Sequence, residues 1–349
     1  MLIPMASWPP LLRADTCAAM LNFEIADHPV YDGLELQWFD DAAHGTGMLA
    51  FLGNRHSHVF DYYAQRGLRL DPADYQIGAG TGAWVETDFA DAGLEISDDG
   101  IHAAALFTDS DGRRIEVRID DRDGRRRRRG GLLAPVSAAI ESPSSLFLVW
   151  LPTFDLVRTG GLPPVLRVGD TDLRVGRLPG EALHRRRLIK YAAPVVSIQV
   201  LPDPRSDGPT DIQPPDPAPD GVAEAAVDGG AVRLAFDPPL PDLAALPDGA
   251  RRDGSWSVSA DGGRLTGGQW FVERDGDQVQ AGLDVTERWR PRHLPILMRM
   301  VTTVAPVFRR WPTTYRWRAV LGPSGKNTGG WTRVGSAGGD DYRRVTGSA

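Results

Sequence analysis

Apolar and polar residues alternate along most of the chain, and this alternation predicts strands. Residues 111–121, DGRRIEVRIDD, place Ile115, Val117 and Ile119 on one side of an extended chain and charged residues on the other. Such a pattern is typical of a half-buried antiparallel strand entered from an Asp-Gly turn. Comparable short runs, separated by Gly, Asp or Pro, begin at residues 33, 47, 58, 83, 101, 145, 164, 194, 231, 255, 269, 278 and 314.

The segments between these runs decide the fold class. No helical pattern of a dozen residues separates the predicted strands, which argues against a parallel sheet with crossover helices. The 39 glycines and 28 prolines favour many turns and few long helices. We therefore predict an all-β protein with an antiparallel, calycin-like barrel or sandwich.

The predicted strands fall into two groups on either side of a segment rich in Pro and Asp. Residues 202–220 read PDPRSDGPTDIQPPDPAPD and contain a single isoleucine. A segment of this composition cannot bury apolar area, which predicts an extended linker or a long exposed loop. We expect an N-terminal β-rich lobe at 1–201, the linker at 202–221 and a C-terminal β-rich lobe at 222–349.

One segment departs from the strand pattern. Residues 291–312, PRHLPILMRMVTTVAPVFRRWP, place apolar residues at helical spacing, namely Leu297, Met300, Val301, Val304, Val307, Phe308 and Trp311. We predict an amphipathic helix at about 292–311, kinked at Pro306 and ended by Pro312. Two interpretations remain open for it. The helix packs on a sheet or across a barrel mouth, or its basic side, with Arg292, Arg299, Arg309 and Arg310, makes a surface that touches lipid or gates a pocket.

Charge and cysteine content narrow the partners. The net charge of −7 argues against a general nucleic-acid binder, because contact with phosphates needs a basic face. The run from Arg125 to Arg129 is the exception. It follows DDRDG, which predicts a solvated loop, with a phosphate- or partner-binding patch as the alternative. Cys17 is the only cysteine, so no disulfide forms within the chain.

The N-terminus and the hydropathy pattern bear on the compartment. The first residues, MLIPMASWPPLLRADTCAAM, lack a basic start, and Pro9 and Pro10 interrupt their apolar part, so no secretory signal is predicted. No window approaches the roughly 18 uninterrupted apolar residues of a membrane span. The expectation is a cytoplasmic protein.

The stretch GNRHSHVFDYY, residues 53–63, contains the densest group of side chains that could bind a metal or catalyse a reaction. Read as a strand, it puts His56, His58, Phe60 and Tyr62 on one face and Asp61 on the other. Two histidines on one face can begin a metal site, with His44 or His102 as a third ligand. The pattern resembles half of a cupin metal motif, but Tyr62 stands where that motif has glutamate. We therefore predict a polar, ligand-facing strand with no resident metal or cofactor.

Acid–base chemistry has four candidate residues: His56, His58, Tyr62 and Asp155. Asp155 follows a very apolar run, and a carboxylate at the end of a buried strand has a raised pKa. The alternative for Asp155 is an ion pair with Arg158. Lys190 or Tyr191 is a weaker candidate for a place near a pocket.

Aromatic residues on the predicted strands suggest a place for a ligand. The chain has ten tryptophans, and several of them lie beside small residues. Core packing accounts for them without a ligand, and an apolar cavity lined by rings is the functional alternative. The candidates for lining such a cavity are Trp38, Phe60, Trp84, Trp150, Trp270 and Trp317.

Five segments carry a family resemblance: LELQWFDD from residue 34, GMLAFL from 47, GAGTGAW from 78, GGQWFVERD from 267 and TYRWRAV from 314. With two β-rich lobes and a late amphipathic helix, they resemble the two-lobed lipocalin-like family that includes carotenoid hydratases. The resemblance is architectural and spans most of the chain. Only QWF matches the Trp-Tyr signature of that family's first strand, so no catalytic residue is transferred. The resemblance implies a hydrophobic, isoprenoid- or lipid-like ligand inside a β-barrel.

Three functions follow from these observations. The first is binding of a hydrophobic small molecule in a β cavity. The second is an enzyme that hydrates or isomerises such a ligand by acid–base chemistry. The third is a structural or interaction module whose linker and arginine loop meet a partner. The sequence assigns no oligomeric state.

Overall fold

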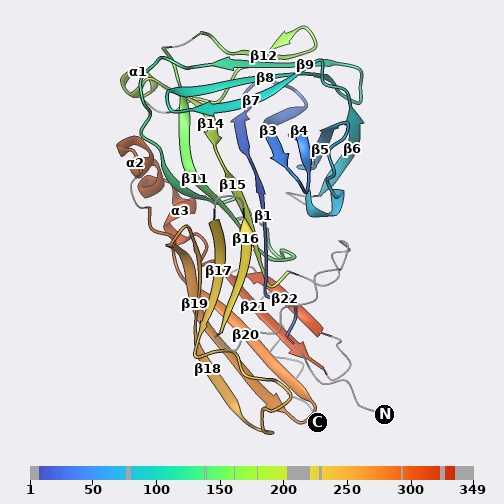
Figure 1. The fold of residues 1–349 in the computed structure, drawn as a ribbon, viewed down its shortest axis with the longest axis vertical. Coiled ribbons are helices and arrows are strands. Elements are labelled where there is room, and N and C mark those ends of the chain that lie inside the picture. Colours follow the sequence, from blue (N-terminus) through green and yellow to red (C-terminus); the bar gives the residue numbers. More distant parts are fainter. Residues whose placement is uncertain are drawn as a thin grey trace.

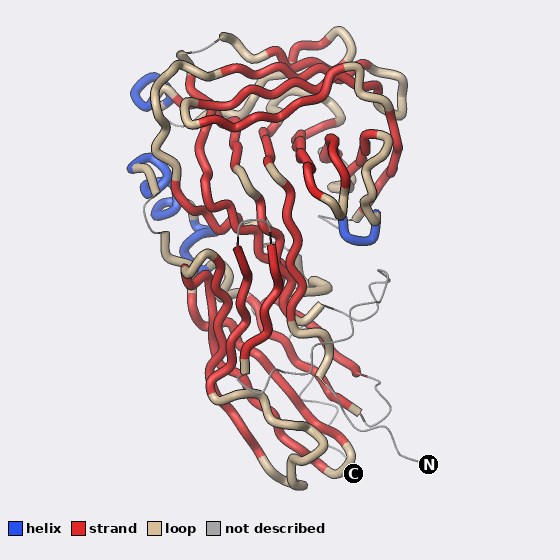
Figure 2. The backbone as a smooth tube through the Cα atoms, viewed as in Figure 1, coloured by secondary structure: helices blue, strands red, loops and turns tan. Residues whose placement is uncertain are grey.

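The computed structural model describes residues 8–75, 80–136, 138, 140–160, 162–178, 180–202, 221–227, 230–291, 294–322 and 327–334. Strands dominate this part of the chain, and the few helices lie mostly along one flank (Figure 2). The predicted all-β class is confirmed. Most of the predicted linker, residues 203–220, lies outside the described residues.

The largest sheet has ten strands and is built from the first 200 residues. Its strands are, in spatial order, β1 (Leu12–Cys17), β15 (Val195–Val200), β11 (Leu146–Arg158), β14 (Arg186–Ala192), β2 (Ala19–Glu24), β3 (Tyr31–Asp41), β4 (Gly45–Asn54), β5 (Phe60–Gln65) and β6 (Thr81–Thr87), with β10 (Gly130–Ala134) paired to β11. Neighbouring strands are antiparallel except β5 and β6, which are parallel. The sheet curls, and β1 leads directly into β2, so that the end of β1 contacts β3 next to this connection (Figure 1).

Two further sheets complete the molecule. A five-stranded sheet runs across the end of the first (Figure 1) and contains β13 (Thr171–Asp172), β12 (Val165–Val168), β9 (Arg114–Asp120), β8 (Gly100–Thr108) and β7 (Asp91–Ser97). A seven-stranded meander contains β16 (Val222–Val227), β17 (Gly230–Asp237), β18 (Arg251–Ala260), β19 (Gly263–Asp275), β20 (Gln278–Glu287), β21 (Tyr315–Leu321) and β22 (Asn327–Arg333).

Alternation along each strand divides the ten-stranded sheet into two faces. On β3, Leu34 and Leu36 belong to the same buried cluster as Phe107 and Val117 of the five-stranded sheet. Phe39 of the same strand faces the opposite way and belongs to another apolar cluster. We call the side turned away from the five-stranded sheet the inner face. Because side chains alternate with a period of two, the polar residues between Leu34 and Phe39 also point to this inner face.

A single apolar cluster joins the ten-stranded sheet to the meander. It contains Leu148 and Ile198 from one sheet and Trp256 and Trp270 from the other. Trp331 of β22 donates a hydrogen bond from its indole to the carbonyl of Val200, at 3.0 Å. Among the described residues, strands before 201 and strands after 221 pair only within their own group, yet they bury their apolar side chains together.

The predicted helix at 292–311 is two helices. α2 (Ile296–Val304) and α3 (Pro306–Arg310) are separated by Ala305, whose φ of −66° and ψ of 121° are extended. A proline disfavours the helical conformation of the residue before it, so Pro306 breaks the helix where a kink was expected. Residues 292 and 293 lie outside the described part. The sequence did not predict the short helices α1 (Glu181–His184) and η1 (Pro72–Tyr75).

Candidate functional site

The histidine pair does not lie on a strand, which corrects the expected shared face of His56 and His58. β4 ends at Asn54 and β5 begins only at Phe60. The side-chain oxygen of Asn54 accepts hydrogen bonds from the backbone N–H groups of His56 and Ser57, which closes a turn. His58 has a left-handed φ of 57°. Both histidines are exposed, and His56 Nε2 lies 2.9 Å from the carbonyl oxygen of Pro29.

The other two acid–base candidates are buried. Tyr62 lies on the inner face and donates a hydrogen bond to the carbonyl of Tyr75, at 2.7 Å. Burial, followed by the nearby charge of Glu35, raises the pKa of Tyr62. This phenol therefore stays protonated at neutral pH and acts as a hydrogen-bond donor.

Asp155 is buried on β11, and burial raises the pKa of its carboxyl, as expected. It accepts a hydrogen bond from the hydroxyl of Tyr191, at 3.2 Å, and Arg186 Nη2 lies 3.6 Å away. The expected alternative, an ion pair with Arg158, is wrong because Arg158 pairs with Asp123 at 2.7 Å.

The six aromatic candidates lie in different parts of the molecule. Phe60 and Trp84 lie together beside Tyr62. Trp38 packs in the cluster between the two sheets of the first lobe, and the indole of Trp150 donates a hydrogen bond to Asp261. The last two, Trp270 and Trp317, are buried in the meander.

A row of side chains crosses the inner face and unites polar and aromatic groups. Strand register places its members opposite one another on β14, β2, β3, β4, β5 and β6. They are, in order, Lys190, Asn22, Glu35, Phe51, Tyr62 and Trp84. The polar half of this inner-face row therefore runs directly into its aromatic half.

Glu35 lies at the junction of the two halves. Its carboxylate accepts hydrogen bonds from the side-chain amides of Asn22, at 2.9 Å, and Gln37, at 2.8 Å. Burial raises the pKa of Glu35, although these two hydrogen bonds and the charge of Lys190 oppose the shift. The ammonium of Lys190 pairs with Glu24, at 2.9 Å. The surroundings of Glu35 thus shift its equilibrium toward the protonated form, which is the state needed for a proton donor.

The aromatic half forms a cluster of rings. The ring centroids of Phe51 and Tyr62 are 5.2 Å apart, and those of Tyr62 and Trp84 are 5.3 Å apart. Tyr75 of η1 lies over the same rings, 5.4 Å from Trp84 and 5.7 Å from Tyr62. Phe60 meets the edge of Phe51 at 6.0 Å. These mutually tilted rings give the inner face an apolar wall beside the carboxyl group.

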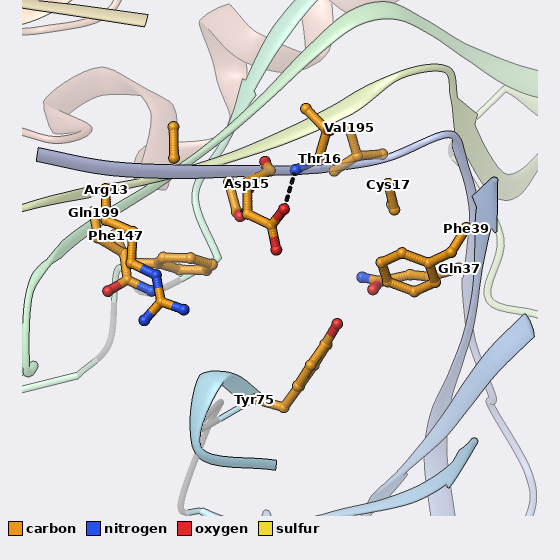
Figure 3. A pocket seen from close by; sticks show the side chains of 12 residues that line it. Arg13, Asp15, Thr16, Cys17, Gln37, Phe39, Tyr75, Phe147, Val195 and Gln199 are labelled. Atoms are coloured by element: carbon orange, nitrogen blue, oxygen red, sulfur yellow. Dashed lines mark hydrogen bonds between the residues drawn. The ribbon is translucent and has the colours of Figure 1, made fainter. Parts of the chain in front are cut away.

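A pocket of about 80 Å³ opens next to the row (Figure 3). Tyr75 projects from η1 toward β1 (Figure 3). Gln37 connects the pocket to Glu35, because its amide donates a hydrogen bond to the carboxylate of Glu35. The lining combines charged, amide and apolar groups from β1, β3, β11, β15 and η1. They are Arg13, Ala14, Asp15, Thr16, Cys17, Gln37, Phe39, Tyr75, Phe147, Val195, Ser197 and Gln199.

The pocket wall is held by His44 and contains the thiol. His44 lies 3.3 Å from Asp15 and 2.9 Å from Asp41, so it ties the β3–β4 turn to β1. Burial raises the pKa of Cys17 well above its usual range, and the carboxylates of Glu35 and Asp15 add to the effect. The thiol is therefore neutral, and a neutral thiol is a poor nucleophile and a poor metal ligand.

The two histidines suggested as a third metal ligand, His44 and His102, both lie beside aspartates. His44 is engaged with its two aspartates, and His102 lies 3.3 Å from Asp120. Within the described ranges, no three His, Cys, Asp or Glu side chains come together as a metal site.

Sequence reasoning missed Glu35, Asn22 and Gln37. The signal was present, since Glu35 and Gln37 alternate with Leu34 and Leu36, and Asn22 interrupts the apolar run AMLNF. An alternating strand does not reveal whether its polar side meets water or a concave protein surface. Only the curl of the sheet brings these polar groups to a partly enclosed face.

No protein-family model, curated protein or solved structure matches the chain. No helix among the described residues has both the length and the apolar content needed to cross a bilayer. What the protein does is therefore inferred from the chemistry of its own residues.

Proposed function

We propose that the protein binds a hydrophobic small molecule on the inner face of the ten-stranded sheet. The inner-face row carries this proposal, because it places a hydrogen-bonded carboxyl group directly beside a wall of aromatic rings. Ligand sites combine a mostly apolar lining with a few placed polar groups in this way. The family resemblance of the sequence supports the same ligand class, isoprenoid- or lipid-like.

The size of the pocket limits how a ligand lies. A volume of about 80 Å³ is small beside the roughly 300–1,000 Å³ of ordinary ligand pockets. The pocket therefore takes one end of a ligand, with the polar end at Gln37 and Glu35. The apolar remainder lies along the rings that line the pocket, Phe39, Tyr75 and Phe147.

Solvent extraction tests this proposal directly. The purified full chain is extracted with organic solvent, the extract is analysed by mass spectrometry, and the stripped protein is titrated with geranylgeraniol. We expect a co-purifying apolar compound or saturable quenching of tryptophan fluorescence. Tyr75→Ala should weaken geranylgeraniol binding roughly tenfold, since an aromatic contact of about 1–2 kcal/mol is lost from the pocket lining.

Trp150→Ala is the matched control, because it also removes an aromatic ring, but Trp150 contacts Asp261 and does not line the pocket. Its affinity should equal that of the unmodified chain. An extract free of apolar compounds, together with no saturable quenching, would contradict the proposal. The interaction module would then be the function to pursue.

The raised pKa of Glu35 favours a second candidate, catalysis of hydration or isomerisation. The protonated carboxyl donates its proton to one carbon of a double bond, and the aromatic wall stabilises the cation that forms. In hydration, water adds to the other carbon and returns a proton to the carboxylate. In isomerisation, the carboxylate removes a different proton instead, and the double bond moves.

Isotope incorporation separates the enzyme from the binder. In D₂O, the unmodified chain should place deuterium on carbon in the recovered ligand. Glu35→Gln should bind the same ligand and incorporate none. Equal incorporation by both proteins would exclude Glu35 as the proton donor, while binding without incorporation in either protein leaves the binding function alone.

A further inference from the structure

We propose that a surface on the flank carrying the helices docks onto membranes that contain anionic phospholipid. At its centre is a hollow of about 620 Å³, which we call the arginine hollow. It lies between the loop after β9, the strands β11 and β14, and the start of α2. Its lining residues are Arg126, Arg128, Arg158, Arg186, Leu294, Pro295, Ile296 and Arg299.

The run of five arginines, Arg125 to Arg129, has two roles: some of its side chains hold the loop against the protein, and others line the hollow. Arg127 is buried, pairs with Asp121 at 3.4 Å and donates a hydrogen bond to the carbonyl of Asp99, at 2.5 Å. Arg129 is half-buried, with its guanidinium 5.6 Å from the ring centre of Tyr191. Both hold the loop against the body. The expected solvated loop is therefore wrong for Arg127, whereas Arg126 and Arg128, on either side of Arg127, are exposed at the hollow.

The hollow holds more positive than negative charge. Three of its arginines have acidic neighbours: Arg158 pairs with Asp123, Arg186 lies near Asp155, and Arg126 lies 3.7 Å from Asp98. Arg128 and Arg299 have no acidic partner among the described residues. In a chain of net charge −7, this local excess fits an anionic group such as a lipid phosphate.

An exposed apolar stripe adjoins the hollow. Ile296, Met300 and Val304 follow one another at four-residue spacing on α2, with exposed fractions of 77%, 61% and 67%. The opposite side of the helix is buried through Met298 and Thr302. α1, which carries Leu183 at 90% exposure, lies on the same flank (Figure 1).

The arginine hollow and the apolar stripe together indicate which kind of partner fits this surface. A free phosphate accounts for the arginines but leaves the apolar stripe in water, while an apolar partner alone leaves the arginine charge unpaired. An anionic bilayer surface satisfies both, because headgroup phosphates meet the arginines while apolar side chains enter the headgroup boundary. This surface is separate from the inner face, and the inference does not depend on the proposed ligand.

Vesicle co-sedimentation tests the inference with the full chain. Vesicles of phosphatidylcholine with phosphatidylglycerol are compared with vesicles of phosphatidylcholine alone. We expect binding to the first and little to the second, weakened by added salt. Arg128→Gln and Arg299→Gln should each lower the partition coefficient about fivefold. Met300→Ser should also lower it, and Met300→Leu should not.

Arg252→Gln is the matched control, since Arg252 is exposed on β18 of the meander and lies outside the hollow. It removes the same charge and should leave binding unchanged, and circular dichroism confirms that each variant is folded. Equal binding to both vesicle types, or no binding to either, would overturn the inference. So would unchanged binding by the Arg128 and Arg299 variants, or competition by inorganic phosphate together with indifference to Met300→Ser.

Discussion

At the residue scale, two opposing influences act on the pKa of Glu35. Its two amide hydrogen bonds favour the charged form, yet burial is the larger influence and raises the pKa of the folded-state carboxyl. A carboxyl with a raised folded pKa stabilises the fold below its unfolded pKa of about 4.3, and that stability is lost as the pH rises through the folded pKa.

Glu35→Gln should therefore raise the free energy of unfolding at pH 7, because the cost of burying a charge is removed. The gain should shrink as the pH falls below about 4, where Glu35 is protonated in both states. Urea denaturation at several pH values measures the difference. A variant that is less stable at pH 7 would show that the hydrogen bonds outweigh burial.

Cys17 should be unreactive in the folded protein. Burial raises the pKa of its thiol, and the thiolate is the form that attacks thiol reagents. We expect negligible reaction with a chromogenic disulfide reagent at about pH 8. Addition of denaturant should release one thiol per chain, and rapid labelling of the native protein would contradict the burial.

At the scale of elements, alternation of apolar and polar residues predicted the strands, but it did not predict where a strand is interrupted. The strand expected through residues 53–63 is broken by the Asn54 turn, which depends on one side chain hydrogen-bonding the backbone ahead of it. The break of α2 from α3 has a local cause, Pro306, and was partly anticipated. The position of Glu35 on a partly enclosed face depends on sheet curl and register, which are contacts between distant segments that no local pattern encodes.

The β19–β20 pairing contains an irregularity at Gly267 and Gly268. A Cβ added at Gly268 would lie 1.7 Å from the carbonyl oxygen of Asp284, so the strands must separate to admit it. Gly268→Ala should lower the free energy of unfolding by about 3 kcal/mol or more. Gly330→Ala, where nothing lies within 4 Å, is the control and should cost less than about 1 kcal/mol. Equal effects would contradict the close approach.

At the scale of the whole molecule, two predicted lobes share one apolar core. Residues of the ten-stranded sheet and the meander belong to the same buried cluster, and Trp331 bonds to Val200 across the junction. Sheets that bury their side chains together lose those contacts together. The described contacts therefore favour one cooperative unit over two independent ones.

Thermal unfolding should accordingly give one transition by circular dichroism and by tryptophan fluorescence. Trp331→Phe removes the hydrogen bond to Val200 and should lower the free energy of unfolding by about 1 kcal/mol. The midpoint of that single transition should fall accordingly. Two separated transitions in the unmodified chain would show that the lobes unfold independently.

The strand order of the ten-stranded sheet has a consequence for synthesis on the ribosome. β1 pairs with β15 alone among the described strands, and Ser197 bonds to Asp15 across 182 positions of sequence. At a translation rate of about 5–20 residues per second, β15 is synthesised roughly ten to forty seconds after β1. During that interval the strand edge of β1 is unpaired and open to pairing with another chain, until residue 200 leaves the exit tunnel.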